Sequence, residues 1–244
     1  MSELPAREFI PLPSAGRAFS AERSVRLGDV DPAGELRFDA IARYLQDIAS
    51  DDALDAALPN ALGWVVRRTM ISVDRPAVTS ERVGLTTFCT GAGRSWAERR
   101  TSIAGEHGAS IEAVSLWVQV DIATGRPAKL GSEFFEIYGE SSSGRVVSSK
   151  LSLPGRPPDY ARREPWVFRR ADLDQLGHVN NAAHWAVVEE GLQQGGARRR
   201  GVAELEYITP ADVGDLCDAM FDHDMTWVVA HGRTLTVARW SPLD

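Results

Sequence analysis

The feature that most constrains the fold of this chain is an internal repeat. The pattern Asp-x-Asp-x-x-Gly occurs at residues 29–34 and again at 172–177, and a run with helical periodicity follows each copy. A second match, a strand-like run that ends in Pro-Ala, occurs at 71–77 and at 206–211. Similar segments in the same order indicate two copies of one structural unit. Two copies of an α+β unit predict a pseudo-dimer, with a functional site between its halves.

The first copy predicts one helix and a strand meander. Apolar residues between Phe38 and Ala49 recur at spacings of three and four, which places them on one face of a helix. A strand is expected before this helix, from Phe19 to Leu27. Four β-branched or aromatic runs follow it, at 69–74, 83–90, 95–103 and 111–121. Because short turns separate these runs, we expect antiparallel pairing and a helix packed on one face of the sheet.

The same order starts again after a Ser-, Gly- and Pro-rich segment at residues 139–160, which we interpret as a linker. The second copy predicts a strand at 166–170, a helix at about 181–194, and strands near 202–208, 215–221, 225–231 and 234–240. We therefore predict an N-terminal domain at residues 1–138 and a C-terminal domain at residues 161–244.

Composition argues against several classes of protein. Apolar residues make up 43% of the chain, enough for a sizeable core, and the net charge of −7 disfavours nucleic-acid binding. The chain has no apolar run of membrane-spanning length, and residues 1–8 lack the features of a secretory signal, so a cytoplasmic location is expected. Cys89 and Cys217 have no Cys or His at metal-ligand spacing. We therefore expect two buried free thiols, no metal and no cofactor.

Residues 172–181 concentrate the reactive side chains of the sequence. Asp174 and His178 stand just before the predicted second helix, whose N-cap would be Asn180 or Asn181. Free N–H groups at a helix N-terminus favour the oxyanion of an acyl-transfer reaction. A carboxylate there could activate water or attack a carbonyl, and a histidine could shuttle the proton. The alternative is that the aspartates only stabilise the turn and the histidine is structural.

Glu190 is a further candidate base on the helix that follows. It stands four residues after Ala186 and seven after Ala183, a spacing that would turn it toward the apolar face. A carboxylate there would have a raised pKa. The alternative is a solvent-exposed helix edge, because Val187 and Val188 leave the buried face ambiguous.

Taken together, these motifs resemble those of the acyl-ACP thioesterases. The resemblance is carried by residues 172–181, by Tyr44-Leu45-Gln46-Asp47, and by strand motifs at 64–68, 71–75 and 115–118. It implies a tandem (double) hotdog fold of the α+β class, in which two antiparallel sheets each wrap a central helix and pack as a pseudo-dimer. It also implies hydrolysis of a fatty acyl thioester on acyl carrier protein, without a cofactor. Asp174 and His178 would be the catalytic residues.

The implied partner is acyl carrier protein with its phosphopantetheine-linked acyl chain, and acyl-CoA is the alternative substrate. The protein would be a monomeric pseudo-dimer or a homodimer. Two departures from the family pattern stand out: Leu176 replaces an asparagine of the plant members, and Pro210 and Ala211 replace a glutamate and a cysteine. Neither Leu176 nor Pro210 supplies a side-chain hydrogen bond.

Several hypotheses about the reaction therefore stay open. Hydrolysis would use Asp174, His178 and the helix N-terminus, or else Asp31 or Glu190 as the carboxylate. A hotdog dehydratase of hydroxyacyl thioesters would instead place Asp47 opposite His178. The third hypothesis is an acyl-binding protein that has lost hydrolysis.

Overall fold

The computed structural model describes residues 9–58, 63–175, 177–194 and 199–243, so residues 1–8 and Leu176, for which the sequence raised expectations, lie outside it. The strands are β1 (Ala18–Ser24), β2 (Gly63–Arg75), β3 (Arg82–Ala92), β4 (Trp96–Gly105), β5 (Ser110–Val120), β6 (Arg162–Val167), β7 (Gly201–Tyr207), β8 (Leu216–Asp222), β9 (Met225–Ala230) and β10 (Arg233–Pro242). The helices are α1 (Phe38–Asp55), α2 (Ser132–Ser142) and α3 (His184–Gln194), with short 3₁₀ helices η1 (Leu27–Asp29), η2 (Arg170–Asp172) and η3 (Asn181–Ala183).

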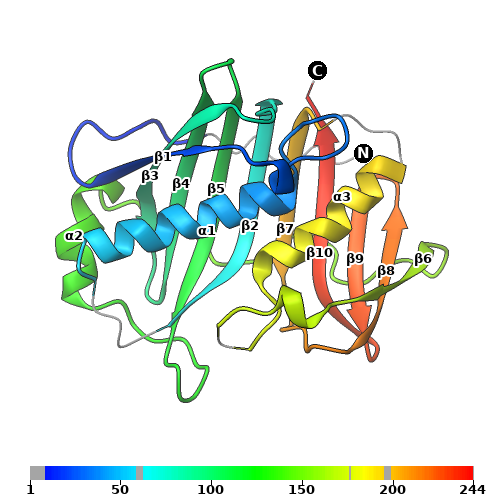
Figure 1. Cartoon of the computed structure of the whole chain (residues 1–244). Helices are drawn as coiled ribbons and strands as arrows, with labels where there is room; N and C mark the ends of the chain where they lie inside the picture. The colour runs from blue at the N-terminus through cyan, green and yellow to red at the C-terminus, as the bar shows by residue number, and fades with distance from the viewer. Residues whose placement is uncertain (1–8, 59–62, 176, 195–198, 244) are drawn as a thin grey trace.

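The described strands form one antiparallel sheet of ten strands, in the order β1-β3-β4-β5-β2-β7-β10-β9-β8-β6. β2 and β7, the corresponding strands of the two halves, pair at its centre, where Met70 lies opposite Glu204. The two predicted half-sheets are therefore continuous. α1 and α3 lie side by side across one face of this sheet and run in opposite directions (Figure 1).

The two copies of the repeated motif adopt the same turn. Asp31 and Asp174 each accept a hydrogen bond from the backbone N–H four residues later, at 2.9 and 3.1 Å. The glycine of each copy, Gly34 or Gly177, has a φ near +80° (+82° and +78°), a conformation that L side chains rarely adopt. A 3₁₀ helix precedes each turn. The halves thus share local hydrogen bonding as well as sequence, which supports a duplication.

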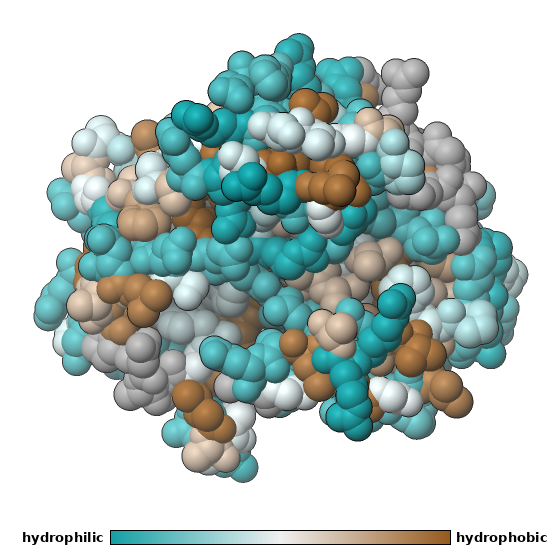
Figure 2. Space-filling view, viewed as in Figure 1, coloured by the Kyte–Doolittle hydropathy of each residue, from teal (hydrophilic) through white to brown (hydrophobic). Residues whose placement is uncertain are grey.

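The main core lies between the helices and the sheet. Phe38 begins α1, and its ring stacks on Trp185 of α3 at a centroid distance of 5.6 Å. Ile41 and Ile48 continue the buried face of α1 over the sheet. The opposite side of this helix is exposed and hydrophilic, as the band of polar residues across Figure 2 shows. None of the described helices is both long enough and apolar enough to cross a membrane.

Helix α2 was not expected from the sequence, and it includes the start of the predicted linker at residue 139. Its buried residues Phe134 and Tyr138 are four positions apart and pack with Leu130 and Cys89 at one end of the first half-sheet. The proposed boundary at residue 138 therefore falls inside this helix.

The rest of the linker is bound to the face of the sheet that the helices leave uncovered. Glu206, which alternates with core residues of β7, is fully buried, and its carboxylate accepts the backbone N–H groups of Ser152 at 2.7 Å and Leu153 at 3.1 Å. The indole N–H of Trp227 donates to the carbonyl of Pro154 at 2.7 Å. The segment is thus an integral part of the fold.

We predict that Glu206→Ala destabilises the protein. The change leaves two linker N–H groups without their acceptor, at a cost of about 2–4 kcal/mol in the free energy of unfolding. Urea unfolding measures this loss, and limited proteolysis should show cleavage within residues 143–161. Glu136→Ala, on the exposed side of α2, is the control and should match the wild type. Equal unfolding curves for the two variants would contradict the prediction.

Candidate active site

The loop between β6 and α3 places Asp174 at the edge of a pocket. η2 begins the loop, and the carboxylate of Asp172 accepts the N–H of Arg169 at 2.7 Å. The Asp172 carbonyl accepts the N–H of Asn180 at 2.8 Å, which brings the two ends of the loop together. Asp174 lies between them, and its Oδ1 accepts the N–H of His178 at 3.1 Å. The loop thus fixes the Asp174 carboxylate beside the start of the helical segment.

That helical segment, η3 followed by α3, begins with two asparagines. The side chain of Asn180 accepts the N–H of Ala182 at 2.8 Å, which confirms that it acts as the N-cap. The carbonyl of Asn181 accepts the phenol of Tyr207 at 3.1 Å, and that phenol in turn accepts the indole N–H of Trp185 at 3.1 Å. Burial raises the pKa of Tyr207, so the phenol stays protonated and donates. Asn181 is therefore held in place by the core.

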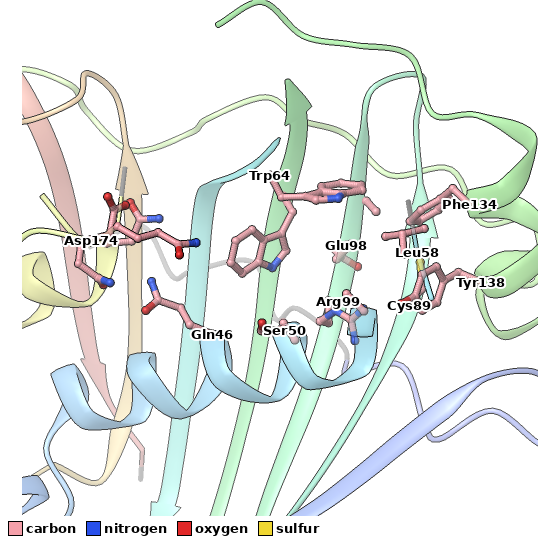
Figure 3. A pocket seen from close by; sticks show the side chains of 17 residues that line it. Gln46, Ser50, Leu58, Trp64, Cys89, Glu98, Arg99, Phe134, Tyr138 and Asp174 are labelled. Carbon is pink, nitrogen blue, oxygen red and sulfur yellow. The ribbon is translucent and has the colours of Figure 1, made fainter. Parts of the chain in front are cut away.

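The pocket has a volume of about 410 Å³, within the range of small-ligand sites, and lies beside α1. Asp174 is at one end with three amides and Gln46 of α1, whereas Leu58, Phe134 and Tyr138 are at the other (Figure 3). Its lining residues are Gln46, Ala49, Ser50, Ala53, Leu58, Trp64, Cys89, Ala97, Glu98, Arg99, Trp117, Phe134, Tyr138, Asp174, Gln175, Asn180 and Asn181. The arrangement joins the Asp174 carboxylate to an interior lined largely by apolar and aromatic side chains, in which Glu98 is a second carboxylate.

Charged side chains near the apolar end neutralise one another. Asp52 is 1% exposed, and its carboxylate accepts hydrogen bonds from Arg17 at 2.6 Å and Tyr138 at 3.0 Å and pairs with Arg99 at 2.7 Å. Burial raises the pKa of Tyr138, so its phenol donates to Asp52. Because Asp52 already balances the charge of Arg99, this part of the pocket wall does not require an anionic ligand.

His178 and Glu190 do not line the pocket, whereas Asp174 does. Asp174 lines the pocket, but the His178 side chain is exposed and is not among the lining residues. The expectation that Glu190 faces the apolar side of its helix is wrong: Glu190 is exposed, and the neighbouring Glu189 is 5% exposed. Helix phase explains the difference, because Val188 and Glu189 together turn toward α1.

Glu189 belongs to a closed counterpart of the site in the first half. Its Oε1 accepts the N–H of Phe38, the first residue of α1, at 2.7 Å. Arg199 binds both Glu189 oxygens at 3.0 Å, Asp31 at 3.1 Å and Glu35 at 3.4 Å. Protein groups thus already bind the N-terminus of α1 and the carboxylate of Asp31.

The charges of this cluster stabilise one another, as in a structural network of ion pairs. Burial alone would raise the pKa of Asp31, but the Glu35 N–H and Arg199 outweigh it and hold that pKa below its usual range. Burial would likewise lower the pKa of Arg199, but Glu189 and Asp31 keep it raised. The hypothesis that Asp31 supplies the reactive carboxylate is therefore disfavoured, since Arg199 holds it outside the pocket.

The dehydratase hypothesis needs Asp47 to face His178, and this contact is not formed. Asp47 is exposed on α1 and pairs with Arg23 at 2.8 Å. Among the described residues, no group of three or more His, Cys, Asp or Glu side chains is arranged to hold a metal.

Two residues were not assigned roles from the sequence. Gln46 lines the pocket near Asp174, and the repeat could have indicated it, because it follows Asp31 by the fifteen positions that separate Asp174 from Glu189. His184 is 3% exposed and lies against Phe168, with ring centroids 4.7 Å apart. Burial lowers the pKa of His184 to about 3, so the ring is neutral in the folded protein.

Comparison with known proteins decides the family. The model of the acyl-ACP thioesterase N-terminal domain matches residues 16–138, half of the chain. The chain belongs to the acyl-ACP thioesterase family. A sequence relative, the uncharacterised protein Rv2001 of Mycobacterium tuberculosis, is 28% identical over 209 residues, which is 85% of this chain and 83% of the relative.

Solved structures confirm the double-hotdog fold of this acyl-ACP thioesterase family member. The 12:0-ACP thioesterase of Umbellularia californica superposes with a TM-score of 0.76 at 20% identity, covering 93% of this chain and 98% of that protein. A Lactobacillus plantarum protein assigned as an oleoyl thioesterase has a TM-score of 0.78 at 18% identity, with 96% and 100% covered. Family and fold together support thioesterase activity.

We predict that burial of His184 makes the protein less stable in mild acid. The unfolded histidine binds a proton near pH 6.5, and the folded one only near pH 3, so stability is lost as the pH falls through this interval. Between pH 7 and pH 5 the free energy of unfolding should fall by about 2 kcal/mol from this residue. Urea unfolding at both pH values tests this. His184→Asn, which cannot titrate, should show a smaller decrease, and the same decrease in both proteins would contradict the assignment.

Proposed function

We propose that this protein hydrolyses fatty acyl thioesters carried on acyl carrier protein, with Asp174 as the catalytic carboxylate. One observation carries the proposal: Asp174 and the start of the second helical segment line the polar end of a pocket whose other end is apolar. The acyl chain would occupy the apolar part beside α1. Its thioester would then lie between Asp174 and Asn181.

The proposed reaction needs one base and one site for negative charge. Asp174 accepts a proton from water as the water oxygen bonds to the thioester carbon. The carbonyl oxygen gains the negative charge, which the free N–H groups at a helix start can stabilise. The C–S bond then breaks, and the thiolate leaves and takes up a proton. The products are a free fatty acid and the carrier thiol.

His178 is proposed to act at the solvent end of the pocket. It is exposed, as is Gln175, so this loop forms the rim that a phosphopantetheine arm would cross. There its imidazole would position the thioester and protonate the leaving thiolate. Glu190 has no part in this mechanism, because it is exposed on α3, away from the loop that carries Asp174 and His178.

Support for acyl carrier protein as the carrier comes from the family and from what its relatives do. One solved relative is named as a 12:0-ACP thioesterase, and another, from Bacteroides thetaiotaomicron, as an acyl-ACP thioesterase. Comparing acyl-ACP with acyl-CoA of the same chain length tests the carrier. The cytoplasmic location and the oligomeric state stay predictions.

We predict that Asp174→Asn lowers kcat for thioester hydrolysis by about 100-fold or more, because the amide cannot accept a proton. The assay follows thiol release from a panel of acyl-ACP and acyl-CoA esters. Asp51→Asn, an exposed position on α1, should keep wild-type activity. Unchanged thiol release by Asp174→Asn would refute the catalytic assignment. Dehydration without thiol release would favour a dehydratase, and binding without turnover an acyl-binding protein.

A second prediction concerns acyl-chain length. Ala53 lines the pocket, seven positions or about 10 Å along α1 from Gln46. Ala53→Phe should fill the apolar end and shift hydrolysis toward shorter acyl chains. Leu54→Phe adds similar volume on the exposed side of the same helix and should leave the chain-length profile unchanged. A folded Ala53→Phe variant with the wild-type profile would show that the chain lies elsewhere.

A further inference from the structure

We propose that Gln46, contributed by the first half, is part of the oxyanion site at the start of the second helical segment. This inference rests on the proposed thioesterase function. In it, the Gln46 amide N–H₂ and the backbone N–H of Asn181 both donate to the thioester oxygen. The argument depends on comparing this site with its closed counterpart.

Gln46 and Glu189 occupy corresponding positions in the duplicated halves. Gln46 follows Asp31 by fifteen positions, and Glu189 follows Asp174 by fifteen. Because α1 and α3 run antiparallel and contact each other, each of these positions lies on a helix that packs against the helix of the other half. For Glu189 the contact is direct, since its Oε1 accepts the N–H of Phe38 at 2.7 Å.

Gln46 lies in the corresponding place at the open site. It lines the pocket together with Asp174, Asn180 and Asn181, and its side chain extends from α1 into the pocket near the Asp174 end (Figure 3). It lines a second, small cavity with Asn181 as well. Asn181 corresponds to Phe38, because each stands seven positions after its loop aspartate. The two sites therefore place corresponding residues beside corresponding helix starts.

The sites differ in what occupies the helix start. In the closed site, Glu189 accepts a hydrogen bond from the Phe38 N–H, and Arg199 balances the charge of Glu189. At the open site, within the part of the chain that the structure describes, no acceptor binds the Asn181 N–H and the Gln46 amide makes no hydrogen bond. A neutral amide has donors that a carboxylate lacks, and it leaves the helix start open to a carbonyl oxygen.

A nearby indole also points to a polar occupant. The Nε1 atom of Trp117 is buried without a hydrogen-bond partner among the described residues, and Trp117 lines both cavities with Gln46. Buried donors in proteins are normally satisfied, by ligand or water where protein supplies no acceptor. The lining of the pocket thus holds more donors than the protein itself uses.

The role follows from the charge that develops in the reaction. As water adds to the carbonyl carbon, its oxygen becomes negative, and donors fixed beside it stabilise that state more than the neutral thioester. Gln46 and Asn181 would supply two such donors, while Asp174 takes the proton. A carboxylate at position 46 would instead repel the oxyanion and compete for the Asn181 N–H, as Glu189 does for the N–H of Phe38.

Variants at position 46 test this. Gln46→Met keeps the approximate size of the side chain and should lower kcat about 100-fold, with KM within a few-fold of the wild type. Gln46→Glu should be less active still at pH 8. Its activity relative to wild type should rise as the pH falls, because a protonated glutamate can again donate. Asp47→Asn, on the exposed side of the same helix, should keep wild-type kcat, since a surface ion pair contributes little.

Thermal unfolding of each variant shows that it is folded. At pH 8, Gln46→Met or Gln46→Glu with kcat within twofold of wild type would overturn the inference, as would a change in KM alone. The proposed function is judged separately. If the wild type releases thiol, Asp174→Asn does not, and the Gln46 variants do, the inference alone is wrong. If the wild type releases no thiol from any ester, both fail.

Discussion

The pairing of β2 with β7 is the contact on which the rest of the structure depends. It joins the two half-sheets at corresponding strands, so the helices that cross them must run antiparallel and side by side. The middle of each helix then lies beside the first turn of the other helix. Glu189 reaches Phe38 this way, and Gln46 reaches the pocket at Asn181. A single-copy unit could not build either site alone, because each combines a loop from one half with a helix from the other.

The corresponding sites in the two halves differ in structure: one is closed by ion pairs, and the other is an open pocket. In the first half, Arg199 joins the carboxylates of Asp31, Glu35 and Glu189, and the last of these caps α1. Removing one partner from a buried cluster of this kind is strongly destabilising, so it serves the fold. In the second half the equivalent space is a pocket of about 410 Å³, and the helix cap comes from Asn180 within its own loop. One site stabilises, and the other is open to a ligand.

Local patterns in the sequence predicted the repeat, the order of strands and both central helices, because each depends on turn residues and periodicity. Helix α2 was missed although Phe134 and Tyr138 have helical spacing, since the serines and glycine after them are typical of a linker. The direction of Glu190 could not be predicted because the neighbouring valines leave the helix phase ambiguous, and the contact of Glu189 with Phe38 resolves it. Asp174 could be found from its motif, whereas the direction of the His178 side chain depends on packing.

The polar groups missing from the family pattern do not leave Asp174 in an apolar environment. Pro210 is exposed, and the polar end of the pocket is instead built from the amides of Gln46, Gln175, Asn180 and Asn181. The closed site shows why neutral groups matter here. There, Arg199 balances three carboxylates, and one of them, Glu189, occupies the N–H at the helix start. In the proposed reaction, the amides beside Asp174 would donate to the negative charge that forms on the thioester oxygen.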